Sequence, residues 1–268
     1  MKKIICVIVS VIILITVSSI NTGCGPGPGT TPCNDSILMA PYNVGLVAYY
    51  KFFAGSPADF SGNGHNGTIS GSVTPTTNPI GITICAMNFG GTTNDYIKVL
   101  SNTAFDFDSS TAMSVVLWYR PTLVSAGTYE LLFGRDSVLH CPDTYGQYSL
   151  GLYDCRRPVF GFHHTSCWDT TLVSSGSCTA INNSYIAQGW QNLIAVYNPI
   201  AANPWKIYRN GIVSIDVHGP CGPSISLSGD IYIGRRFKGD IDDIKIYNRA
   251  LTNTEIAFLK SYVSPCCK

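Results

Sequence analysis

Two stretches far apart in the sequence carry the oxygen-rich side chains that hard cations prefer. One is the glycine-rich sequence DFSGNG at residues 59–64, and the other is the pair Asp242-Asp243. Calcium takes roughly six to eight oxygen ligands from carboxylates, amides and backbone carbonyls, and glycines let loop carbonyls turn towards an ion. The two stretches therefore indicate a cation site. The alternative is that Asp59 and Asn63 form Asx turns and that Asp242-Asp243 face water from a strand.

A second set of side chains has the chemistry of sugar recognition. Asp143, Arg156, Trp168 and Asp169 lie within residues 139–180. Sugars present flat apolar faces ringed by hydroxyl groups, which binding sites meet with an aromatic plane and with charged or amide hydrogen-bonding groups. We expect this segment to shape a binding face. The alternative is that its aromatic side chains cover disulfides. The basic pairs Arg156-Arg157 and Arg235-Arg236 are each interpreted as solvated strand ends.

Composition excludes several other classes of function. Lys and Arg number 17 against 16 Asp and Glu, a net charge of +1, so the chain lacks the basic surplus with which proteins neutralise nucleic-acid phosphates. Glycosidases generally need two facing carboxyl groups, but the only glutamates are Glu130 and Glu255. No G-x-S-x-G sequence marks a serine nucleophile. We therefore expect neither nucleic-acid binding nor catalysis.

The N-terminus has the features of an export signal. Two lysines precede the uncharged apolar residues 4–17, a run too short to span a bilayer comfortably. Gly23-Cys24 resembles a bacterial lipoprotein junction, and residues 24–44 are predicted to be a Gly/Pro-rich tether. We expect residues 1–23 to be a signal peptide and the protein to be extracytoplasmic, either secreted or anchored at the cell surface through lipid on Cys24. The alternative is an ordinary signal peptide with Cys24 in a disulfide.

The cysteines agree with export. Nine follow Cys24, and their spacings form no paired C-x-x-C motifs of the kind that bind zinc. Disulfides are expected in an oxidising compartment. Nine is odd, so lipidation of Cys24 would leave at least one thiol unpaired. Residues 139–180 are a long insert without helix or strand periodicity, and local cross-links are expected among its four cysteines, Cys141, Cys155, Cys167 and Cys178.

The remaining pattern is that of many short strands. Segments rich in β-branched and aromatic residues recur between turn residues, which predicts an antiparallel sandwich or jelly roll in one domain, residues 45–268. Asn210-Gly211 between two such segments predicts a hairpin. Thr252 and Glu255 form a capping box before Ile256, which predicts one short C-terminal helix.

These segments carry a resemblance to a known family. The chain resembles a laminin G-like domain of the concanavalin A-like lectin and glucanase superfamily over nearly its whole body. The similar phrases, in family order, are residues 45–52, 59–68, 88–97, 113–118, 190–197, 207–211 and 239–251. The resemblance implies an antiparallel two-sheet jelly roll, used mostly for binding, with Trp118 and Trp190 as packing residues. Residues 139–180 depart from the family pattern.

The resemblance also bears on the site. Related domains commonly hold one calcium ion, and similarity assigns its ligands to Asp59, Asn63 and Asp242, in a structural role. The superfamily's glucanases place glutamates on alternate positions of one strand, and this chain has no such pair. We therefore interpret the protein as a non-catalytic binding module for a glycan or a glycosylated surface. The lipid proposed on Cys24 is the only membrane contact that we expect. Two alternatives stay open: a protein-binding adhesion or assembly module, and an accessory protein of a glycan hydrolase.

Overall fold

Two antiparallel sheets face each other in the computed structural model, which describes residues 35–108, 110–122, 129–135, 148–153, 156–163, 168–172, 189–214 and 229–265. Sheet A has the order β13-β12-β11-β6-β15-β4-β3, and β1 also pairs with β15. Its strands are β1 (Leu46–Tyr50), β3 (Thr74–Thr76), β4 (Ala86–Gly90), β6 (Met113–Pro121), β11 (Gln191–Tyr197), β12 (Trp205–Arg209), β13 (Ile212–Ser214) and β15 (Lys238–Tyr247).

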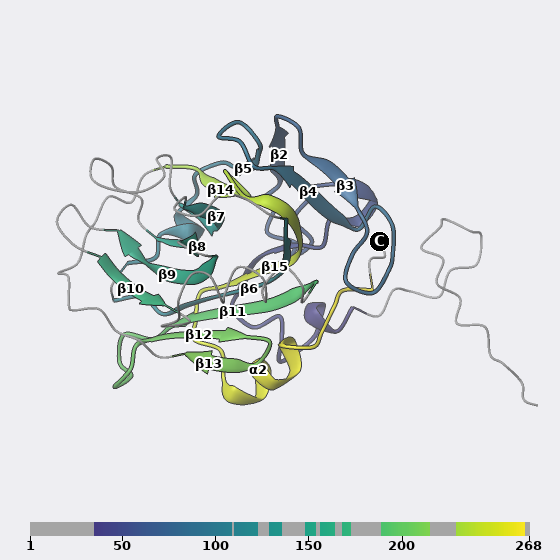
Figure 1. Ribbon diagram of the computed structural model, residues 1–268. Coiled ribbons are helices and arrows are strands. Elements are labelled where there is room, and N and C mark those ends of the chain that lie inside the picture. Colours follow the sequence, from purple (N-terminus) through teal and green to yellow (C-terminus); the bar gives the residue numbers. More distant parts are fainter. Residues whose placement is uncertain are drawn as a thin grey trace, which may run out of the picture.

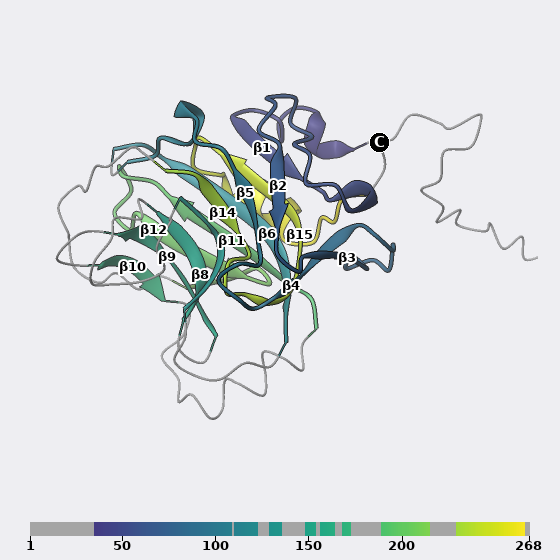
Figure 2. The same cartoon turned by 90° about the horizontal axis from the view of Figure 1, so that it is seen from above.

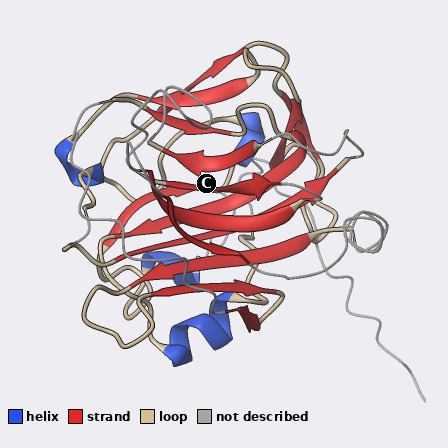
Figure 3. Cartoon of the chain, turned by 60° about the vertical axis from the view of Figure 1, so that its left-hand side comes forward, coloured by secondary structure: helices blue, strands red, loops and turns tan. Residues whose placement is uncertain are grey.

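Sheet B has the order β10-β9-β8-β7-β14-β5-β2. Its strands are β2 (Gly67–Ser70), β5 (Tyr96–Val99), β7 (Glu130–Gly134), β8 (Ser149–Tyr153), β9 (Arg157–His163), β10 (Trp168–Leu172) and β14 (Ile231–Ile233). The two sheets form a β-sandwich, and strands are the main regular secondary structure of the described chain (Figures 1 and 3). The predicted all-β jelly-roll fold is therefore confirmed.

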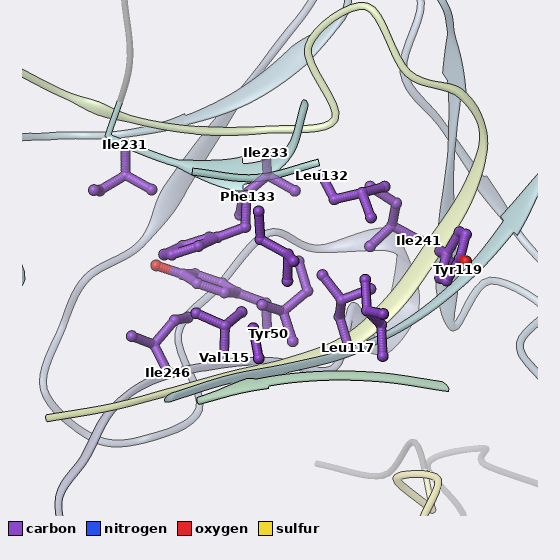
Figure 4. Close-up of a cluster of buried hydrophobic side chains, with 14 of the residues drawn as sticks. Tyr50, Val115, Leu117, Tyr119, Leu132, Phe133, Ile231, Ile233, Ile241 and Ile246 are labelled. Atoms are coloured by element: carbon purple, nitrogen blue, oxygen red, sulfur yellow. The ribbon is translucent and has the colours of Figure 1, made fainter. Parts of the chain in front are cut away.

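The core lies between the two sheets because alternate residues of each strand point inward. Val115 and Leu117 of β6 face Leu132, Phe133 and other inward side chains of sheet B (Figure 4). The residues that alternate with these inward-facing side chains along each strand point to the outer faces of the two sheets.

Short helices lie at the margin of the sandwich. They are the 3-10 turns η1 (Ser36–Leu38), η2 (Phe53–Gly55) and η3 (Thr103–Phe105) and the helix α2 (Asn253–Leu259). The predicted capping box is confirmed, because the Thr252 side chain accepts from the Glu255 N–H and Glu255 accepts from the Thr252 N–H. Ile256 and Leu259 of α2 pack on the outer face of sheet A. No described helix is both long and apolar enough to cross a membrane.

The two ends of the described chain meet on sheet A. β1 runs beside the second half of β15, so purple and yellow segments lie side by side in Figure 2. Asp35 and Ile37 precede β1 and are already buried. The packed part of the chain thus begins before the domain boundary expected at residue 45.

Local predictions elsewhere had mixed outcomes. The hairpin at Asn210-Gly211 is confirmed: φ is 50° at Asn210 and 79° at Gly211, and β12 pairs with β13. The expectation that residues 139–180 lack strand periodicity is wrong, because β8, β9 and β10 fall within them and form one side of sheet B. Cys85 is disulfide-bonded.

Candidate functional site

A pair of tyrosines lies on the outer face of sheet B. Tyr96 of β5 and Tyr232 of β14 alternate with inward-facing isoleucines, so both rings point away from the core between the sheets, although Tyr232 also packs against a small buried cluster that includes Tyr129 and Val159. Their centroids are 5.1 Å apart and the rings are nearly perpendicular, at 76°. Both side chains are partly exposed. This edge-to-face contact fixes the rings while it leaves aromatic surface for a ligand.

An arginine lies against both rings. The Arg235 guanidinium is 5.7 Å from the Tyr96 centroid and 5.1 Å from the Tyr232 centroid, and its Nε donates to the Thr93 carbonyl at 3.2 Å. The turn that places Arg235 there begins at Gly234, where φ is 76° and a Cβ would lie 2.2 Å from the Phe89 ring. Only glycine fits that position, so the turn and the direction of Arg235 are closely fixed.

A charged pair adjoins the tyrosines. Lys98 Nζ lies 3.5 Å from Asp230 Oδ2, with side chains 37% and 28% exposed. Lys98 stands opposite Tyr232 in the pairing of β5 with β14. Asp230 Oδ1 accepts the Ser101 N–H at 2.9 Å. We call Tyr96, Lys98, Asp230, Tyr232 and Arg235 the tyrosine face. It offers ring surface, two cationic donors and one carboxylate acceptor within a small area, which is the chemistry of sugar recognition.

The sequence did not single out this face. The alternation of apolar and polar residues in β5 indicates that Tyr96 and Lys98 lie on the same side of the strand, and this could be predicted from the sequence. Their neighbours Tyr232 and Arg235 are more than a hundred residues away in the chain, and only strand pairing brings them together. Arg235 is partly exposed just after the end of β14, as its sequence suggested, and it also lies over two aromatic rings.

The predicted sugar-binding residues are distributed differently. Trp168 and Asp169 begin β10, at the far edge of sheet B from β5, and their side chains are outside the described part. Asp143 and Cys24 lie outside the described residues. Arg156 is 5% exposed, so its interpretation as a solvated strand end is wrong.

Arg156 instead forms a buried ion pair. Its Nε lies 3.3 Å from Glu130 Oε1, and both side chains are at most 5% exposed. Burial raises the pKa of Glu130 to about 7, although Arg156 and the Lys238 N–H oppose this shift. Burial likewise lowers the pKa of Arg156, while Glu130 opposes that change. Glu130, which the sequence showed as an isolated glutamate, therefore has a close cationic partner.

The predicted calcium ligands have other partners in the structure. Asp59 accepts four hydrogen bonds, from the N–H groups of Tyr49, Ser61 and His65 and from the Ser61 hydroxyl, at 2.9–3.0 Å. Asn63 Nδ2 donates to the carbonyls of Leu46 and Val47. These bonds hold the loop beside β1, and Asp59 forms an Asx turn by accepting the Ser61 N–H, whereas Asn63 bonds to distant carbonyls instead.

Asp242 has a different environment. It is 1% exposed on β15, so the interpretation of Asp242-Asp243 as a water-facing pair is wrong. Neither Asp242 oxygen has a hydrogen-bond partner among the described residues, and burial followed by the nearby Asp243 carboxylate raises the Asp242 pKa. Among the residues described, no group of three or more acidic, histidine or cysteine side chains could hold a metal. That search does not cover amide or carbonyl ligands, so calcium binding by Asp59, Asn63 and Asp242 stays a prediction.

Comparison with known structures gives the same fold at low sequence identity. The receptor-binding domain of botulinum neurotoxin C/D mosaic serotype matches with a TM-score of 0.62 and 14% identity, over 81% of this chain and 51% of that chain. The binding domain of Paraclostridial Mosquitocidal Protein 1 gives 0.60 and 19%, over 81% and 52%. The chain thus spans about half the length of these toxin domains.

A bacterial carbohydrate-active enzyme supplies a third match. Domain 4 of AbnA, an extracellular arabinanase from Geobacillus stearothermophilus solved with arabinotriose, gives a TM-score of 0.52 and 20% identity, over 81% of this chain and 98% of that chain. No curated protein sequence matches significantly. A family model described as the concanavalin A-like lectin/glucanases superfamily matches residues 90–257. With most of its sandwich inside that match, the chain belongs to the concanavalin A-like lectin/glucanases superfamily.

Proposed function

We propose that this protein is a non-catalytic module that binds carbohydrate through the tyrosine face. The observation that carries the proposal is the arrangement of Tyr96 and Tyr232 beside Arg235 and the Lys98–Asp230 pair. A sugar ring can lie against a tyrosine ring through its C–H face, while its hydroxyls reach the guanidinium and the carboxylate at the edge.

The similar structures support the same class of function. The two toxin domains are described as binding domains, and the arabinanase domain was solved with a trisaccharide. At identities of 20% or less they establish the fold alone, so the ligand is inferred from the side chains of this chain.

A glycan array on the purified protein, followed by calorimetry with the best ligand, tests the proposal. Tyr232→Ala should weaken binding by about tenfold or more, which corresponds to about 1.4 kcal/mol, because a stacking surface is lost. Arg235→Ala should weaken binding to a similar degree. Arg236→Ala is the matched control, since Arg236 is exposed and adjacent in sequence. Melting curves of each variant check that the fold is intact.

The outcomes separate the proposal from its alternatives. Saturable glycan binding that Tyr232→Ala and Arg235→Ala reduce and Arg236→Ala leaves unchanged supports the tyrosine face. An array without any binding, together with capture of one protein partner that Tyr232→Ala abolishes, would instead assign the face to protein adhesion. Glycan binding that neither variant changes would place the site elsewhere.

A further inference from the structure

A second row of functional side chains crosses the outer face of sheet A. Thr74 of β3, Asn88 of β4, Asp240 of β15 and Arg120 of β6 stand opposite one another in the strand pairing. Gln191 of β11 is opposite Tyr119, so Trp190, the preceding residue, stands beside Arg120. We call Thr74, Asn88, Asp240, Arg120 and Trp190 the cross-strand row.

Direct contacts join the centre of this row. Asn88 Nδ2 donates to Asp240 Oδ1 at 2.7 Å, and Arg120 Nε donates to Asp240 Oδ2 at 2.8 Å. The Arg120 guanidinium carbon lies 5.0 Å from the centroid of the Trp190 ring. Asp240 is only 6% exposed, and its buried carboxylate holds the side chains of Asn88 and Arg120 in place. A surface held in one arrangement loses little side-chain entropy when a ligand binds.

The row presents polar atoms that the protein does not use. The Arg120 side chain is 41% exposed, and its Nη atoms make no hydrogen bond to any described residue. The same holds for Asn88 Oδ1, on a partly exposed side chain. Thr74 is exposed, and Trp190 is partly exposed rather than a core packing residue. A ligand therefore meets donors, acceptors and a ring side by side.

The next row along the same strands is covered. Trp118 Nε1 donates to the Tyr262 carbonyl at 2.8 Å, and Asn192 Nδ2 donates to the Leu259 carbonyl at 3.3 Å. The C-terminal segment thus occupies the face at Trp118 and Asn192, which lie two residues before Arg120 and two residues after Trp190 and pair with each other. The described C-terminal segment makes no such bond to the side chains of the cross-strand row.

The charge and the length of the row define its ligand. Arg120 and Asp240 neutralise each other, so the row does not favour an anion. Sugar hydroxyls both donate and accept, which matches the Arg120 Nη donors beside the Asn88 acceptor. Adjacent strands lie about 4.8 Å apart, so four steps from Thr74 to Trp190 span roughly 19 Å. A single sugar ring would contact only part of that length.

We propose that the cross-strand row is a second binding site, which takes a linear neutral oligosaccharide of at least three sugar units. It lies on the opposite side of the sandwich from the tyrosine face and does not depend on that face. The sugar rings would follow the row across the strands, with one ring against Trp190 and with hydroxyls at Arg120, Asp240 and Asn88.

The experiment uses the full-length mature protein carrying Tyr232→Ala, so that the tyrosine face is impaired. Calorimetric titrations use mono-, di-, tri- and hexasaccharides of arabinose, xylose and glucose. Affinity should rise up to the trisaccharide at least. Trp190→Ala should lower trisaccharide affinity by about tenfold or more, and Asn88→Ala and Thr74→Ala should lower it less. Thr83→Ala, an exposed threonine outside the row, is the matched control. Because Trp190→Ala has the larger structural risk, the Asn88 and Thr74 variants test the row on an intact surface.

Each result decides between the two sites. In the Tyr232→Ala background, loss of oligosaccharide binding with Trp190→Ala and Asn88→Ala, but not with Thr83→Ala, supports the row. This holds whether or not the tyrosine face binds a ligand of its own. Oligosaccharide binding that the parent protein shows and that Tyr232→Ala alone abolishes would overturn the row and leave the proposed function in place. Equal affinity for monosaccharides and trisaccharides would overturn the oligosaccharide assignment. An absence of binding to every neutral sugar would overturn the row.

Discussion

Lys51 Nζ lies 3.2 Å from Asp35 Oδ2 in a pair whose side chains are each 2% exposed. Asp35 also accepts the hydroxyls of Tyr49 at 3.1 Å and Tyr262 at 2.6 Å. One buried carboxylate therefore joins the segment before β1, β1 itself and the segment after α2. Because the lysine and both hydroxyls point at it, Asp35 connects the two ends of the described chain.

Replacing Asp35 should destabilise the protein strongly. Asp35→Ala leaves Lys51 buried without its carboxylate, and breaking such a pair typically costs about 3 to 5 kcal/mol. Denaturant unfolding measures the loss. The double variant Asp35→Leu/Lys51→Met is the control, since removal of both charges should cost clearly less than Asp35→Ala alone. An Asp35→Ala cost below about 1 kcal/mol would show that the pair contributes little.

Glu130 should make stability depend on pH in a defined window. Its pKa is raised from 4.5 to about 7 in the folded protein, mainly by burial. Between these values the folded state keeps a proton that the unfolded chain releases, so this contribution to stability falls as pH rises through about 7. Glu130→Gln should flatten the change in unfolding free energy across this window. An unchanged pH dependence in Glu130→Gln would contradict the shift.

Glu255 should act in the opposite direction at acidic pH. Hydrogen bonds from Arg249 hold its pKa at about 2, below the usual 4.5. The stability it confers is fully present above about 4.5 and is lost as pH falls towards 2. Glu255→Gln removes this acid-sensitive contribution and should cost about 1 to 2 kcal/mol at neutral pH, because the charged pairing with Arg249 is lost while glutamine can still complete the capping box. Acid unfolding followed by circular dichroism compares the two proteins.

Asp59 should stabilise its loop with or without calcium. Asp59→Ala removes an acceptor of four hydrogen bonds and should lower the melting temperature by several degrees in chelator. The expected calcium site is tested on the same samples. If calcium raises the melting temperature of the parent protein but not of Asp59→Ala or Asp242→Ala, an ion is bound there. Identical curves with chelator and with calcium would leave only the hydrogen-bonded loop.

Cys24 should decide how the protein is retained. If Gly23-Cys24 is a lipoprotein junction, Cys24→Ser should release the protein from membranes without a change in its melting curve. Fractionation of membranes and medium, with mass spectrometry of the mature N-terminus, measures this. Unlipidated mature parent protein in the medium would contradict the lipid anchor and favour plain secretion.

Much of the architecture was predictable because its causes are local. Alternation of apolar and polar residues predicts a strand wherever it occurs, and Asn210-Gly211 tolerates the positive φ angles of its hairpin. The capping box of Thr252 and Glu255 needs only four consecutive residues. Each of these signals depends on neighbours in the chain, so the sequence by itself determined them.

The candidate sites could not be obtained in that way. Tyr96 and Tyr232, like Asn88 and Asp240, are adjacent only through strand pairing, and nothing in either segment names its partner. The sequence predicts that Arg156 is a surface residue, whereas the fold buries it against Glu130. Alternation determines which side of a strand a residue faces. The tertiary structure decides which strand lies beside it, because that choice depends on the packing of the whole sandwich.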